Sequence, residues 1–93
     1  MDADRIVEEQ IALWRKRPYS DLCGLINMAE HTDMPGVSGE TWVRETQVVW
    51  DNKPGGNIRV IVDVFVPVKQ GGVVGSLAYD DFILGPDGAF VGE

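Results

Sequence analysis

Cysteine and histidine are nearly absent from this sequence, and acidic residues far outnumber basic ones. One Cys and one His exclude a disulfide within the chain and the usual four-ligand zinc site. Eight Lys and Arg residues stand against 15 Asp and Glu residues, which leaves a net charge of −7. That charge argues against nucleic acid and anionic membranes as partners. No apolar run approaches the length of a membrane span, and no secretory signal pattern is present, so we expect a cytoplasmic protein without cofactor or metal.

The length and the composition indicate one globular domain. Of the 93 residues, 44% are hydrophobic and 25% are charged, as in ordinary globular proteins with a single core. The pattern changes near residue 40. We therefore expect one domain over 1–93, with a helical part over 1–40 and a sheet part over 41–93.

The helical part predicts two helices. Apolar residues between Ile6 and Trp14 recur at three- and four-residue spacings, which predicts a helix over 4–17 that stops at Pro18. A second, short helix is expected to follow from about residue 20, weakened by Gly24. Pro and Gly residues within 31–39 predict a loop there.

From residue 41 onward the hydrophobic pattern has a period of two, which predicts strands. The expected strands cover residues 41–50, 57–68, 73–84 and 89–93. Short turns rich in Gly separate them, so the strands should form an antiparallel meander. The predicted fold class is α+β, with a helix and a short second helix packed on one face of a four-stranded antiparallel sheet.

Six β-branched residues at the even positions from Ile58 to Val68 predict the sheet face that meets the helix. A hairpin turn at 69–72 is expected to pair these even positions with odd positions of the next strand. Tyr79 and Asp81 would then lie between helix and sheet, where a small apolar ligand is the candidate occupant. The predicted ligand pocket consists of Trp14, Val62, Leu77, Tyr79 and Asp81.

The opposite face keeps apolar side chains, and this predicts that a partner covers it. Either the even or the odd positions of 41–50 lie on this face, depending on the register. The even register adds two Trp residues, and the resulting predicted dimer face consists of Trp42, Trp50, Ile61, Asp63, Phe65 and Phe82. The expected partner is a second copy, in a two-fold homodimer.

Three residues are candidates for proton transfer. Asp81 and Tyr79 share one strand face, and His31 is the lone His, between Glu30 and Asp33. No phosphate-binding loop or nucleophile motif accompanies them. Whether the chain is an enzyme therefore stays open.

The segment YDDFILGPDGAFV at 79–91 resembles the last hairpin of SnoaL-like domains, in which an acidic, alternating strand meets a turn ending in Asp-Gly. The resemblance implies a cystatin-like fold of the nuclear transport factor 2-like and SnoaL-like superfamily. It also implies a pocket lined by Tyr79 and Asp81 and a dimer formed through the sheet.

These observations predict a small binding or accessory domain that pairs through its sheet as a homodimer and offers a site for a small apolar ligand. One alternative is a SnoaL-like enzyme that uses Asp81 and Tyr79 for proton-transfer or hydration chemistry. The other is a protein-interaction subunit that uses an exposed strand edge.

Overall fold

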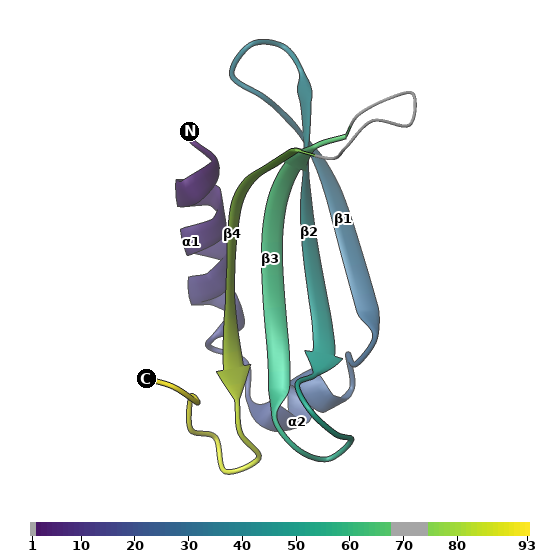
Figure 1. The fold of residues 1–93 in the computed structure, drawn as a ribbon, viewed down its shortest axis with the longest axis vertical. Helices are drawn as coiled ribbons and strands as arrows, with labels where there is room; N and C mark the ends of the chain where they lie inside the picture. The colour runs from purple at the N-terminus through teal and green to yellow at the C-terminus, as the bar shows by residue number, and fades with distance from the viewer. Residues whose placement is uncertain (1, 68–74) are drawn as a thin grey trace.

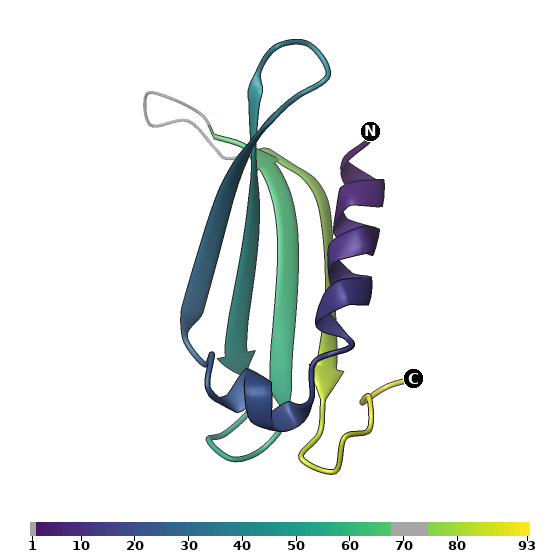
Figure 2. The same cartoon turned by 180° about the vertical axis from the view of Figure 1, so that it is seen from behind.

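The computed structural model describes residues 2–67 and 75–93, and it confirms the predicted fold class. A helix and a short second helix accompany one antiparallel sheet, whose strands follow one another in the order β1-β2-β3-β4 (Figures 1 and 2). Helix α1 lies along the β4 side of the sheet, and β1 forms the far edge. The expected turn at 69–72, and the expected strand residues 68, 73 and 74, lie outside the described residues.

Helix α1, Ala3–Trp14, is amphipathic as predicted, but it ends three residues earlier than expected. The Asp2 carboxylate caps it by accepting a hydrogen bond of 2.8 Å from the backbone N–H of Arg5. Its buried residues recur at helical spacing and face the sheet: Ala3, Ile6, Val7, Ile11 and Trp14. Helix α2, Tyr19–Cys23, follows Pro18 and ends at Gly24, which confirms a short second helix.

The loop prediction for 31–39 is wrong over most of its length. Strand β1, Met28–Pro35, covers its first half and pairs antiparallel with β2, Thr41–Trp50. The turn lies at 36–40, where the Gly36 N–H donates to the Glu40 carbonyl over 2.7 Å. β1 is an edge strand with mostly exposed side chains, so it lacks the apolar alternation that marks a strand in a sequence. The sheet part therefore begins at residue 28, not 41.

The strand expected over 89–93 is also wrong. This segment forms a single bridge, between Phe90 and Leu84, and one further backbone bond from the Val91 N–H to the Ile83 carbonyl, 2.9 Å long. Gly88 and Gly92 have positive φ, of 84° and 83°, and these turns prevent a straight strand. The sheet thus keeps four strands because β1 takes the place of the expected last one.

Strand β3, Ile58–Val66, and strand β4, Gly75–Leu84, confirm the middle of the predicted meander, but their pairing differs from the expected one. Near the hairpin, Phe65 pairs with Ser76, which agrees with the predicted pairing of even with odd positions. The next residue of β3, Val64, pairs with Ala78, so Leu77 is an extra residue in a β-bulge. Beyond this bulge, even positions of β3 face even positions of β4. The predicted even-to-odd pairing is therefore wrong for most of β4.

The bulge decides which side chains meet the helix. After the bulge along the chain, the residues of β4 that face the helix lie beside the even positions of β3. They are Ala78, Asp80, Phe82 and Leu84. The even positions of β2 share this face, because Val48 pairs with Val60 and Thr46 with Val62. Together with the apolar side of α1 they form the core. The second face of the sheet carries the odd positions, and we call it the open face.

Candidate functional site on the open face of the sheet

The open face combines partly buried apolar side chains with charged ones. Helices α1 and α2 both pack on the opposite side, against residues of the core. The apolar residues of the open face are Val43, Val49, Ile61, Phe65 and Ile83. Four acidic residues accompany them along the strands: Asp33, Glu45, Asp63 and Asp81.

Four titratable residues lie directly opposite one another in a row that crosses all four strands. His31 of β1 pairs with Glu45 of β2, Glu45 pairs with Asp63 of β3, and Asp63 pairs with Tyr79 of β4. The His31 Nε2 atom and a Glu45 carboxylate oxygen are 2.5 Å apart. We call these four residues the titratable row. Two carboxylates directly opposite each other are an unfavourable pair in a sheet.

Each carboxylate of the row has a polar partner within the face. Glu45 accepts a bond of 2.6 Å from the amide of Gln47, in addition to its contact with His31. Asp63 accepts a bond of 2.8 Å from the hydroxyl of Ser76, which lies next to the bulge. These bonds hold the two carboxylates in place without neutralising their repulsion.

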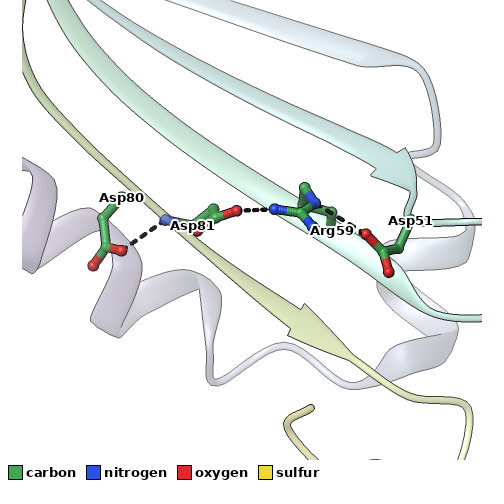
Figure 3. Close-up of polar contacts among 4 residues, drawn as sticks. All are labelled: Asp51, Arg59, Asp80 and Asp81. Carbon is green, nitrogen blue, oxygen red and sulfur yellow. Dashed lines mark hydrogen bonds and ion pairs between the residues drawn. The ribbon is translucent and has the colours of Figure 1, made fainter. Parts of the chain in front are cut away.

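A second polar cluster lies at the α2 end of the face, around Arg59. Its guanidinium donates to Asp51 through Nε and Nη2, at 3.0 and 2.9 Å, and to Asp81 through Nη1 (Figure 3). The bonds to Asp51, more than those to Asp81, raise the pKa of Arg59, so it stays charged. The Asp80 carboxylate instead accepts from the Asp81 backbone N–H on the helix side of β4 (Figure 3).

Tyr79 lies at the β4 end of the titratable row and is 55% exposed. Its pKa is raised, first by partial burial of the phenol and then by the negative charge of Asp81, while Arg59 opposes the shift. The phenol is therefore neutral at pH 7 and acts as a hydrogen-bond donor or acceptor, not as a base.

The residues of the predicted ligand pocket do not come together. Trp14 and Val62 are buried in the core on the helix side. Tyr79 and Asp81 point to the open face, and Leu77 lies at the bulge with 44% of its surface exposed. The predicted position of Tyr79 and Asp81 between helix and sheet is wrong. Beyond the bulge, the odd residues of β4 face away from the helix, together with the odd residues of β3.

The predicted dimer face is likewise divided. Ile61, Asp63 and Phe65 lie on the open face, as expected. Trp42, Trp50 and Phe82 instead face the helix, where Trp42 and Phe82 belong to the core and Trp50 packs against it. Of the two registers left open for 41–50, the structure has the one that places the odd positions on the open face.

All three candidates for proton transfer, Asp81, Tyr79 and His31, lie on the open face, although sequence reasoning expected His31 in a loop and the other two on the helix side of the sheet. It also missed Glu45 and Arg59. The alternation of β2 carried a signal for Glu45, because its odd positions are one of the two sets considered for this face. Arg59 is one of the odd positions of β3, and its ion pair with Asp81 depends on the bulge, which brings Asp81 to the same face.

Two depressions lie beside β1, and neither is centred on the titratable row. One, of about 120 Å³, is lined by Gln10, Leu13, Trp14, Arg17 and Glu30, between α1 and β1. The other is a shallow depression of about 380 Å³ at the β1–β2 turn, lined by residues 33–35 and 39–41. The first is smaller than the roughly 300 Å³ at which ordinary ligand sites begin, and the second is open.

A general acid or base gains its effect in a site that excludes water, whereas the open face is covered by neither helix. Among the described residues, no group of three His, Cys, Asp or Glu side chains is placed to hold a metal ion. In residues 2–67 and 75–93, neither helix is long and apolar enough to cross a membrane.

In comparisons with known proteins, no family model, curated protein or solved structure matches this chain. The resemblance to cystatin-like and SnoaL-like proteins therefore remains a prediction.

Proposed function

We propose that this chain is a small binding domain whose open face docks a partner that contributes positive charge. The observation that carries this proposal is the excess of acid on a face that neither helix covers. Among residues 2–67 and 75–93, five carboxylates are present there, counting Asp51 at the end of β2, against one Arg and one His: Asp33, Glu45, Asp51, Asp63 and Asp81 versus Arg59 and His31. An opposite charge placed over such a face is attracted at long range and held at contact.

The partly buried apolar residues of the face support a partner with apolar groups as well. Ile61 and Phe65 lie next to Asp63 along β3, so cationic and apolar contacts would alternate. An amphipathic basic segment satisfies both requirements, because its Lys or Arg side chains reach the carboxylates while its apolar side chains cover Ile61 and Phe65.

The size of the face sets the expected affinity. Strands of nine residues that rise about 3.3 Å per residue, in a four-stranded sheet with about 4.8 Å between strands, give roughly 570 Å². A standard interface buries about 800 Å² on each partner. We therefore expect a reversible complex with a dissociation constant in the micromolar range.

A homodimer that stacks two open faces is less consistent with these charges. Two such faces would bring ten carboxylates together against two Arg and two His, given the five acids counted on each face. The three aromatic residues that made this dimer attractive, Trp42, Trp50 and Phe82, contribute to the core instead. An enzyme that uses Asp81, Tyr79 and His31 remains an alternative proposal, and their common face is the observation that favours it.

The test is titration of the protein with a designed amphipathic peptide of alternating Lys and Leu, followed by calorimetry. We expect micromolar binding that weakens as salt is added. Replacing Glu45→Gln and Asp63→Asn together should weaken it about threefold to tenfold, since each exposed charge pair contributes up to about 1 kcal/mol.

The matched control removes two acids from the solvent face of α1, Asp4→Asn with Glu8→Gln, and changes the net charge by the same amount. It should bind the peptide with nearly unchanged affinity. Equal weakening by both double variants would mean that the peptide senses only the net charge, and the proposed site would be wrong.

A further inference from the structure

The edge of β1 is one of the two outer edges of the sheet, and among the described residues no backbone bond from another segment reaches it. The sheet order leaves β1 with a single strand neighbour, β2, and α1 runs along the opposite side of the molecule (Figures 1 and 2). The other edge strand, β4, is bonded by residues 85–93 at its last two residues, where the Val91 N–H donates to the Ile83 carbonyl and Phe90 bridges Leu84. An eight-residue uncovered edge offers unpaired backbone groups to another strand.

The hydrogen bond at the β1–β2 turn fixes which backbone groups of β1 are free. Gly36 and Glu40 form a bonded pair, and bonded and non-bonded pairs alternate along an antiparallel ladder. The even residues of β1 therefore bond to β2. Ala29, His31 and Asp33 direct their N–H and C=O groups away from the sheet. Pro35, the next in that series, has no N–H and closes this edge.

We propose that the β1 edge of a second copy pairs antiparallel with this edge, with the two-fold axis at His31, so that the two sheets become one. Each of the three outward-directed residues, Ala29, His31 and Asp33, then has a hydrogen-bonding partner residue in the second copy. The resulting cross-strand pairs are His31 with His31, Ala29 with Asp33, Glu30 with Thr32 and Met28 with Met34 of the second copy.

The residue pattern of β1 selects this register among the symmetric ones. An axis at Glu30 would place two carboxylates directly opposite each other. An axis at Thr32 would place Pro35 opposite Ala29 and lose ladder bonds for want of an N–H. With the axis at His31, no acid faces an acid, and all three outward residues pair.

This inference rests on the proposed function in one respect: the proposed binding face would reach its full extent only in the dimer. The titratable row reaches β1 at His31, so pairing at His31 would join two such rows across the axis. The acidic open faces of both copies would then form one continuous surface on the same side. A basic partner long enough to cross the axis would contact both copies and bind more tightly than to one.

Sedimentation velocity over a range from about 10 μM to about 1 mM tests the dimer, since an interface this small predicts weak association. We expect a concentration-dependent dimer in the wild-type chain. Ala29→Asp, which meets Asp33 of the second copy twice, should weaken it about tenfold. Ala29→Lys should strengthen it, and Ala29→Asp combined with Asp33→Lys should restore it.

A Phe65→Asp variant serves as the matched control, because Phe65 lies on the open face and away from the β1 edge. It should leave the dimer unchanged. A monomer at every concentration, or a dimer that responds to Phe65→Asp and not to Ala29→Asp, would overturn the inference. If Ala29→Asp and Ala29→Lys changed the dimer dissociation constant in the same direction, the proposed register would be wrong.

Crosslinking provides a second readout that does not depend on affinity. In a Cys23→Ser background, His31→Cys should form a disulfide-linked dimer under mild oxidation, because bonded pairs place Cα atoms about 5.5 Å apart. Asp33→Cys, which faces Ala29, should crosslink far more slowly, and equal rates would contradict the two-fold axis. Binding of the basic peptide to a monomer would leave the proposed function standing even if the dimer failed.

Discussion

The guanidinium of Arg15 holds the carboxylate of Glu93 through two hydrogen bonds, of 2.7 and 2.6 Å, although 78 residues separate them along the chain. The same guanidinium lies 3.9 Å from the ring centroid of Phe90 and 5.7 Å from that of Phe82. Phe82 and Phe90 in turn meet edge to face, with centroids 5.7 Å apart. The guanidinium of Arg15 at the end of α1 thus contacts both the segment 85–93 and strand β4.

This contact predicts a pH-dependent contribution to stability. The bond from Arg15 lowers the pKa of Glu93 below its usual value. A carboxylate with a lowered folded-state pKa stabilises the fold above its unfolded pKa, and that contribution is lost as pH falls through the folded pKa. Thermal unfolding of wild type and Glu93→Gln should therefore show a higher midpoint for wild type at pH 7. The difference should narrow by about pH 3, which lies below the unfolded pKa of a Glu carboxyl, about 4.3.

The exposed Glu8 on α1 provides the control, since Glu8→Gln removes the same charge without a bonded partner in the described structure. That variant should unfold close to wild type at both pH values. A midpoint difference for Glu93→Gln that persists unchanged at pH 3 would show that the carboxylate's charge is not the cause.

The parts of the fold that could be predicted are those in which burial imposes a period. The β-branched alternation around Val60 and Val62 identified β3, and the helical spacing from Ile6 to Trp14 identified α1. Strand β1 escaped prediction because an edge strand is held by backbone bonds, which any residue can make. Glu30, His31 and Asp33 have no apolar partner that a sequence pattern would reveal.

The candidate site shows a different kind of gap. His31, Tyr79 and Asp81 were identified by their chemistry, which the residue type alone provides. The face on which Tyr79 and Asp81 lie depends on which residues of β4 point toward the helix. One extra residue, Leu77, exchanges the two sets. A bulge formed without Gly leaves no local signal, so side-chain chemistry was predictable here while its position was not.

Deleting Leu77 should test how strongly the bulge specifies the fold. Without it, Phe65 with Ser76 and Val64 with Ala78 become consecutive pairs of a regular antiparallel ladder. Phe82 and Leu84, which are 4% exposed, then keep their places in the core. We expect the deletion variant to stay folded by circular dichroism, with a free energy of unfolding within about 2 kcal/mol of wild type by urea titration.

Leu77→Ala is the comparison that separates the length of β4 from its side chain. Leu77 is half exposed, so the substitution should change the free energy of unfolding by less than about 1 kcal/mol. An unfolded deletion variant beside a stable Leu77→Ala would show that the fold needs the bulge itself, and not only the register on its two sides.

The electrostatics around Tyr79 predict opposite shifts for two neutralising substitutions. Burial raises the pKa of the phenol first, the charge of Asp81 raises it further, and Arg59 lowers it. Asp81→Asn should therefore bring the pKa of Tyr79 down, and Arg59→Gln should take it up. Ultraviolet titration in a Tyr19→Phe background measures Tyr79 alone, since the chain has two Tyr residues. Shifts of one sign in both variants would contradict the ion-pair geometry of the open face.

Two glycines should respond in opposite directions to the same substitution. A Cβ at Gly36 would lie 2.5 Å from both the Glu40 Oε1 and the Trp42 Nε1 atoms, which bond to each other over 2.9 Å. Gly36→Ala must part or displace that bond at the β1–β2 turn. We expect a loss of about 1–2 kcal/mol in the free energy of unfolding, by urea denaturation.

At Gly24 the same Cβ would meet only the Asp21 carbonyl oxygen, at an ordinary contact distance of 3.5 Å. Its backbone is right-handed helical, with φ of −72°, so Ala fits without strain. Gly24→Ala should stabilise the protein by about 0.4–1 kcal/mol, because it restricts the unfolded chain. Destabilisation at both positions would show that α2 and the β1–β2 turn are equally intolerant of a side chain. The close packing around Glu40 and Trp42 would then not explain the effect at Gly36.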